Sequence, residues 1–145
     1  MIINGLKLFV IAFFIFIVTD IFWLGLIAKN MYFEQYRAWL RVSEGQLQPI
    51  WWASVMVYLL FALSVVVFVL PLAKGSLLTA GFYGAFLGAV IYGVYDFTCV
   101  AIFKNWPVGM AFIDWAWGIF LCSWVSTLTA WIQGWQFYHR TTPLN

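Results

Sequence analysis

Four long apolar stretches dominate the pattern of hydrophobic and polar positions along the chain. They cover about residues 6–28, 50–73, 77–103 and 108–134. Each is longer than the roughly 20 residues that a helix needs to cross a bilayer. The alternation with period two that is typical of a membrane barrel is absent. Because a helix satisfies its backbone hydrogen bonds internally, the pattern predicts an all-α fold, an integral membrane four-helix bundle that forms a single domain over residues 1–145.

The longest connection, residues 29–49, has a helical pattern of its own. Aromatic and apolar residues recur at helical spacing, and charged residues fall between them. This pattern predicts a short helix that lies in the membrane interface. We interpret it as a connecting helix that covers the bundle rather than as a binding element. The residues that carry the pattern are Tyr32, Phe33, Tyr36, Trp39 and Leu40.

The composition agrees with a chain surrounded by lipid. Of the 145 residues, 66% are hydrophobic and 8% are charged, whereas soluble domains have about 25% charged residues. Seven Lys and Arg residues cannot build a basic patch, so we expect no nucleic-acid partner. Cys99 and Cys122 are far apart in apolar stretches, which is typical of cysteines that act as small hydrophobic residues. Neither a metal nor a cofactor is expected, because no familiar ligand spacing is present.

The connections define two sides of the membrane. Side A carries the N-terminus, residues 74–76 and the C-terminus, and side B carries residues 29–49 and 104–107. Three basic residues on side A and four on side B do not decide the orientation by the positive-inside rule. These residues are Lys7, Lys74 and Arg140 on side A, and Lys29, Arg37, Arg41 and Lys104 on side B.

Three of the five acidic residues, Asp20, Asp96 and Asp114, lie inside apolar spans. Counted from Lys29 and Lys104, all three fall in one layer about 12–15 Å from the side B loops, at about 1.5 Å per residue. Tyr58 in the second span reaches the same layer. No basic residue lies in the interior of a span, so another group must offset the cost of a carboxylate in an apolar environment. Bound protons, aromatic hydrogen-bond donors and a polar or cationic ligand are the alternatives.

The faces of the helices indicate which residues accompany these acids. In the third span Gly81, Ala85 and Gly88 share a face with Asp96, and such small residues let helices approach closely. This face could serve a homo-oligomer as well as the bundle itself. Trp23 and Trp117 each lie one turn from an acid. The remaining tryptophans near side B, Trp39, Trp51, Trp52 and Trp106, are assigned to an interfacial belt. The candidate ligand-binding residues are therefore Asp20, Asp96, Asp114, Trp23, Tyr58, Tyr92, Tyr95 and Trp117.

Each acid also has a structural interpretation. Asp114 could cap the fourth helix, because residues 114–134 alone still span a bilayer. Asp20 could lie near the interface and reach water. Asp96 could make a hydrogen bond between helices and nothing more. The shared depth of the three acids favours a joint site.

Three segments together resemble the bacterial family of four-span membrane proteins named domain of unknown function 2177. They are Asp20-Ile-Phe-Trp-Leu-Gly25, Tyr92-Gly-Val-Tyr-Asp-Phe-Thr98 and Asp114-Trp-Ala-Trp-Gly118. The family pattern has Asn where this chain has Cys99, which weakens any role for that position. The resemblance implies a multi-pass protein of the bacterial cytoplasmic membrane. It implies no substrate or reaction.

Three classes of function fit these residues. We favour a protein that binds an amphipathic small molecule or lipid in an Asp and aromatic pocket within one half of the bilayer, with the question of enzyme activity left open. The first alternative is a proton- or cation-coupled transporter, because membrane carboxyls are typical of such proteins. The second is a structural or assembly subunit whose acids stabilise the bundle and bind nothing.

Overall fold

The computed structural model describes residues 2–141, and most of them are helical. Four helices are long and apolar enough to cross a membrane: Asn4–Ile27, Trp51–Ala73, Leu77–Ile102 and Val108–Gln136. The predicted all-α membrane bundle is therefore confirmed. The elements are α1 (Ile2–Phe22), the π-helical segment η1 (Trp23–Ile27), α2 (Lys29–Tyr36), β1 (Val42–Ser43), β2 (Gln46–Leu47), α3 (Trp51–Ser64), the π-helical segment η2 (Val65–Val69), α4 (Leu70–Ala73), α5 (Leu77–Ile102) and α6 (Val108–Thr141).

The second span changes its helical geometry just before a proline. Pro71 has no N–H group, and in a regular helix its ring would collide with the carbonyl of Val67. The segment η2 precedes it and widens the turn, so that the N–H of Leu70 donates to the carbonyl of Val65. Such π turns accommodate a proline without ending the helix. The span therefore continues through α4 to Ala73.

The loop between the first two spans contains the predicted interfacial helix, but the helix is shorter than the aromatic spacing suggests. It ends at Tyr36, and the chain then turns into a small antiparallel hairpin of β1 and β2. Glu44 and Gly45 connect the two strands, both with positive φ (51° and 75°). A tight hairpin turn requires this left-handed backbone conformation, and glycine adopts it readily. Trp39 and Leu40 therefore follow the helix rather than extend it.

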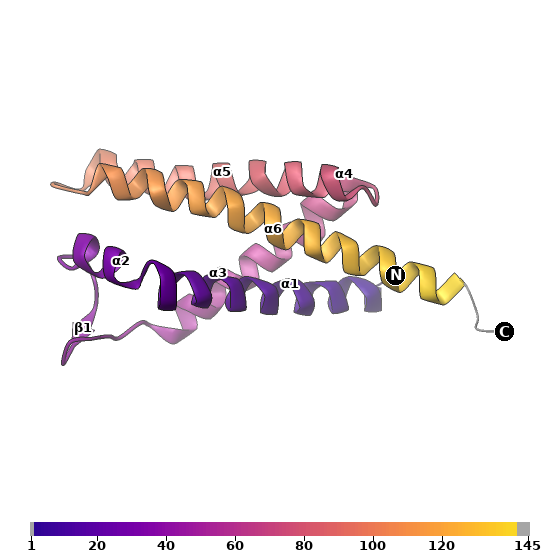
Figure 1. Cartoon of the computed structure of the whole chain (residues 1–145), viewed down its shortest axis with the longest axis horizontal. Helices are drawn as coiled ribbons and strands as arrows, with labels where there is room; N and C mark the ends of the chain where they lie inside the picture. The colour runs from indigo at the N-terminus through magenta and orange to yellow at the C-terminus, as the bar shows by residue number, and fades with distance from the viewer. Residues whose placement is uncertain (1, 142–145) are drawn as a thin grey trace.

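Small residues bring α5 and α6 together, and the two helices lie side by side in Figure 1. Gly84 and Gly88 are buried on α5. A Cβ atom at Gly84 would lie 2.7 Å from the Cβ of Ser126, and one at Gly88 would lie 2.8 Å from the carbonyl carbon of Gly118. Only residues without a side chain allow so close an approach. The small-residue face of the third span therefore points into the bundle, as predicted.

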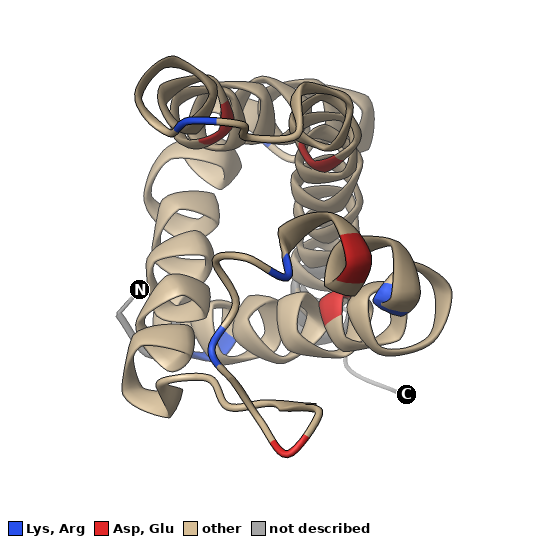
Figure 2. Cartoon of the chain, turned by 90° about the vertical axis from the view of Figure 1, so that its left-hand side faces the viewer, with Lys and Arg blue, Asp and Glu red and all other residues tan. Residues whose placement is uncertain are grey.

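The apolar core fills the middle of the bundle and its side A half. Phe16 of α1, Val65 of η2, and Leu121 and Val125 of α6 are fully buried there. The first turn of α1 and the last turns of α6 lie toward one end of the molecule, and α2 with the hairpin lies at the other (Figure 1). Figure 2 views the molecule from side B and shows how few charged positions the ribbon carries. Two of them, Asp20 and Asp96, are nevertheless buried, 7% and 0% exposed.

Candidate functional site

Asp20 is held by donors from two other helices. The hydroxyl of Tyr58 on α3 donates to Oδ2 over 2.7 Å, and Nε1 of Trp117 on α6 donates to Oδ1 over 3.0 Å. Both oxygens of the carboxyl group thus have partners within the bundle. The interpretation of Asp20 as an interfacial acid that reaches water is therefore wrong. The predicted shared depth of Tyr58 and Asp20 is confirmed by their hydrogen bond. Trp117, which lies one turn from Asp114 in the sequence, donates to Asp20.

Two tryptophans connect Asp20 to the side B loop. The rings of Trp23 and Trp117 stack with their centroids 4.3 Å apart and their planes at 8°. Trp23 begins the π-helical segment η1, in which the first span leaves regular α-helical geometry. Its Nε1 donates to the hydroxyl of Tyr32 over 3.5 Å. Tyr32, from α2, was not among the predicted site residues.

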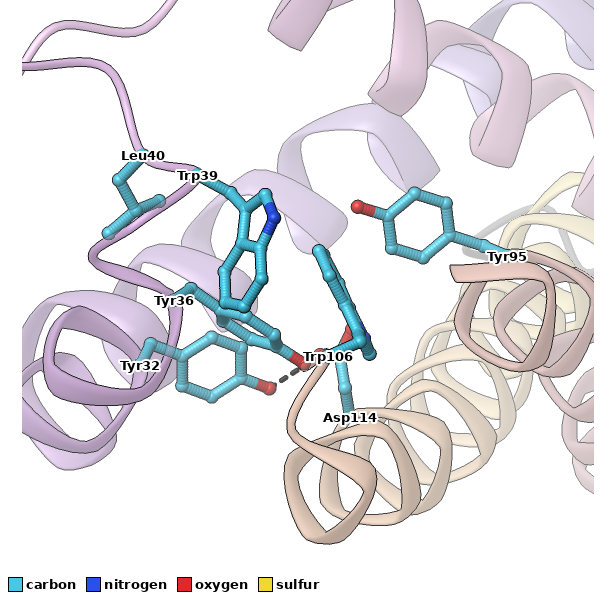
Figure 3. Close-up of a pocket in the computed structure, with 7 residues that line it drawn as sticks. All are labelled: Tyr32, Tyr36, Trp39, Leu40, Tyr95, Trp106 and Asp114. Carbon is cyan, nitrogen blue, oxygen red and sulfur yellow. Dashed lines mark hydrogen bonds between the residues drawn. The ribbon is translucent and has the colours of Figure 1, made fainter. Parts of the chain in front are cut away.

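Asp114 lies well inside α6 and does not cap it. The helix begins at Val108, so its first turn ends before Asp114, and the interpretation as an N-terminal cap is wrong. Oδ1 of Asp114 accepts a short hydrogen bond from the hydroxyl of Tyr32 (Figure 3). Asp114 also interacts electrostatically with Asp20 and with Asp96. The three acids of the spans therefore lie in one region of the bundle.

Asp96 has the least exposed surface of the three acids, with a relative exposure of 0%. Neither carboxyl oxygen has a hydrogen-bond partner among residues 4–136, whose side chains the structure describes. The interpretation of Asp96 as a simple interhelical hydrogen bond is therefore wrong. Its electrostatic neighbours include Asp114 and Tyr36. A buried carboxyl group without partners is costly, which marks Asp96 as a functional candidate.

A cavity of about 230 Å³ lies on side B next to this acidic region. Within the part of the chain that the structure describes, the hydroxyl of Tyr36 and Nε1 of Trp106 are buried without hydrogen-bond partners. The centroid of the Trp106 ring lies 5.0 Å from the ring centroid of Tyr36 and 4.9 Å from that of Trp39. Figure 3 shows how the side chains surround the cavity. Its lining residues are Tyr32, Tyr36, Trp39, Leu40, Tyr95, Trp106 and Asp114.

The tyrosines of α2 stay protonated in this environment. Burial raises the pKa of Tyr32 above its ordinary value, and the negative charge of Asp114 and the hydrogen bond to it raise it further. Burial and the charges of Asp114 and Asp96 likewise raise the pKa of Tyr36. Both hydroxyls therefore remain neutral hydrogen-bond donors at physiological pH.

The remaining predicted residues divide between the cavity and the core. Tyr95 lines the cavity and is 58% exposed. Tyr92 lies elsewhere. Its ring stacks on that of Phe61, with the ring centroids 5.7 Å apart. The same ring packs directly against Gly118 and fills the space that a side chain there would need. Tyr92 thus joins the apolar core beneath the acids rather than the cavity wall. Among the described residues, no group of three or more His, Cys, Asp or Glu side chains is placed to hold a metal ion.

Sequence reasoning missed five of the seven residues that line the cavity: Tyr32, Tyr36, Trp39, Leu40 and Trp106. The hydrophobic pattern assigned them to a covering helix and an interfacial belt. One signal could have revealed the first two, because Tyr32 and Tyr36 are four residues apart on one face of a helix. Which way that face points depends on contacts with α6, which local spacing does not encode.

Four membrane-length helices with buried acids on one side define a multi-pass α-helical membrane protein. The family DUF2177, described as a predicted membrane protein, matches residues 5–131, so the chain belongs to that family and the resemblance seen in its three motifs is confirmed. No curated protein matches the chain, and no solved structure matches it.

Proposed function

We propose that the protein binds an amphipathic small molecule or lipid in the side B cavity, within the cytoplasmic membrane of a bacterium. One observation carries the proposal. The cavity has two buried donors, the hydroxyl of Tyr36 and Nε1 of Trp106, without partners among the described residues. Leaving such groups unpaired costs about 1–3 kcal/mol each. An acceptor oxygen in the head group of a ligand would offset that cost.

The position and lining of the cavity support an amphipathic ligand. Its wall combines aromatic rings with the carboxyl group of Asp114, which is the usual composition of a small-molecule site. The volume of about 230 Å³ is below the range of about 300–1,000 Å³ for sites that enclose a drug-sized ligand. It therefore suits a head group, and the apolar part of the ligand would lie along the exposed hydrophobic surface of the spans. The proposal concerns binding and assigns no reaction.

The two alternatives have less support. A transporter needs a polar route to both sides, whereas the side A half of the bundle is packed with apolar residues such as Phe16, Val65 and Leu121. A purely structural role suits Asp20, whose two oxygens are both hydrogen-bonded. It does not suit Asp96, whose oxygens have no hydrogen-bond partners among the side chains described, those of residues 4–136.

Native mass spectrometry of the gently extracted protein tests the proposal. We expect a discrete co-purifying mass on the wild-type protein that is lost or weakened in Trp106→Phe, because Phe has no N–H group to donate. Trp131→Phe is the matched control, since Trp131 is an exposed tryptophan on the side A part of α6. Spectra that show the same mixture of bulk phospholipid on all three proteins would contradict the proposal. The same spectra report the oligomeric state.

A further inference from the structure

The wall of the cavity is acidic, and none of the seven described residues that line it is basic. Asp114 contributes one carboxyl group to the wall. Its Oδ1 accepts from Tyr32, and its Oδ2 makes no hydrogen bond to a described residue. Asp96 lies within electrostatic range of Asp114 and of Tyr36, and it too has no hydrogen-bond partner among residues 4–136. The protein thus places one carboxyl group in the wall of the cavity, with Asp96 in electrostatic contact with it, and no described basic residue in that wall.

The wall is also aromatic, and the ring of Trp106 lies beside the rings of Tyr36, Trp39 and Phe103. Its plane is tilted by 39° to that of Tyr36 and by 55° to that of Trp39. Figure 3 shows the rings of Tyr36, Trp39 and Trp106 gathered at the wall of the cavity, near Asp114. The face of an aromatic ring attracts a cation that lies within about 6 Å of its centre. Together with a carboxyl group, such rings form the usual recognition site for a quaternary ammonium or alkylammonium group.

We propose that the head group of the ligand is a cation, of the alkylammonium or choline type, held between Asp114 and the rings of Tyr36, Trp39 and Trp106. This inference rests on the proposed function and names the ligand class of the same site. A cation offsets the cost of a carboxylate at the edge of the bilayer, whereas a neutral head group leaves that cost in place. The buried donors of Tyr36 and Trp106 then bind an oxygen next to the cation.

Three probes with the same twelve-carbon chain test the charge of the head group. Dodecyltrimethylammonium, dodecylphosphocholine and dodecanol are added singly, below their micellar concentrations, to the protein in maltoside micelles. Native mass spectrometry then measures the fraction of protein that carries each probe. We expect the two probes that carry a quaternary ammonium group, the cationic ammonium and the zwitterionic phosphocholine, to bind at least about tenfold more tightly than dodecanol. A preference for the phosphocholine probe indicates a lipid head group, and a preference for the ammonium probe indicates a free amphipathic cation.

Matched variants test whether the preference for quaternary ammonium probes depends on residues of the cavity. Asp114→Asn removes the charge and keeps an oxygen for Tyr32, and we expect it to lose most of the preference for cations. Glu44→Gln removes the same charge from the exposed side B hairpin and should retain the preference. Asp96→Asn serves as a second variant if the melting temperature shows that Asp114→Asn does not fold.

Two outcomes would overturn the inference in different ways. Equal binding of all three probes, abolished by Trp106→Phe, would leave the proposed function in place and reject a cationic head group. A preference for cations that survives both Asp114→Asn and Asp96→Asn would also reject it. The absence of binding by any probe, together with no co-purifying mass, would reject the inference and the proposed function together.

Discussion

At the scale of single residues, the three membrane acids have different surroundings. Asp20 is buried and accepts hydrogen bonds from Tyr58 and Trp117, so its role within the bundle is structural. Asp114 is half-buried and connects α6 to Tyr32 at the edge of the cavity. Asp96 has no exposed surface and no hydrogen-bond partner within residues 4–136. Aspartates at similar depth therefore have different surroundings: Asp20 is hydrogen-bonded within the bundle, whereas Asp114 and Asp96 belong to the candidate site.

The structural role of Asp20 predicts the effect of removing one of its donors. Tyr58→Phe deletes the hydroxyl and leaves a buried carboxyl oxygen without that partner, which should lower the free energy of unfolding by about 1–3 kcal/mol. Thermal or denaturant unfolding of the purified protein in micelles measures the change. Tyr83→Phe is the control, because Tyr83 packs its ring against the core and makes no hydrogen bond to a described residue. Equal stabilities of the two variants would contradict the structural role of Asp20.

At the scale of elements, the pairing of α5 with α6 sets the position of both Asp96 and Asp114. Gly88 and Gly118 allow the two backbones to approach, and each acid lies on the side B part of its helix. The helix α2 then closes over this region through the hydrogen bond from Tyr32. The cavity thus lies where a membrane helix pair meets a loop helix.

The close approach of α5 and α6 predicts a large effect from one added methyl group. The Cβ atom of Gly88→Ala would lie 2.8 Å from the carbonyl carbon of Gly118 and 3.0 Å from the Cβ of Cys122. The helices must move apart, which we expect to cost about 1–3 kcal/mol of unfolding free energy. Gly134→Ala is the control, because no atom lies within 4 Å of its Cβ position. It should be neutral or stabilising by up to about 1 kcal/mol. Unfolding in micelles checks both, and a neutral Gly88→Ala would contradict the packing.

The sequence predicts the spans far better than the site, and the physical reason is the range of the interactions involved. Membrane spans follow from local hydropathy, and the inward face of α5 follows from the spacing of its glycines. Asp20 and Tyr58 share a depth that residue counting along two helices reveals. The orientation of α2 and the place of Trp106 depend on contacts between segments about 70 residues apart or more, such as Tyr36 with Trp106. No local period carries that information.

At the scale of the whole molecule, polarity is distributed unevenly between the two sides. The side A half of the bundle is packed mainly with apolar side chains, with the buried hydroxyls of Ser126 and Thr129 on α6 as exceptions, and the side B part holds the acids, the stacked tryptophans and the cavity. This asymmetry suits a protein that receives a ligand from one side rather than one that passes it through the membrane. Because the small-residue face of α5 packs against α6, a homo-oligomer would need another face, and its formation stays a prediction for native mass spectrometry.

Photo-crosslinking at the cavity is the most direct test of the central claim that this side B cavity binds a ligand. A benzoylphenylalanine residue in place of Trp39 stands at the cavity wall, and one in place of Trp131 stands on the exposed surface of α6. After irradiation of intact cells, mass spectrometry identifies what is attached at each position. We predict a discrete amphipathic molecule at position 39 and only bulk phospholipid at position 131. The same bulk phospholipid at both positions would contradict the account.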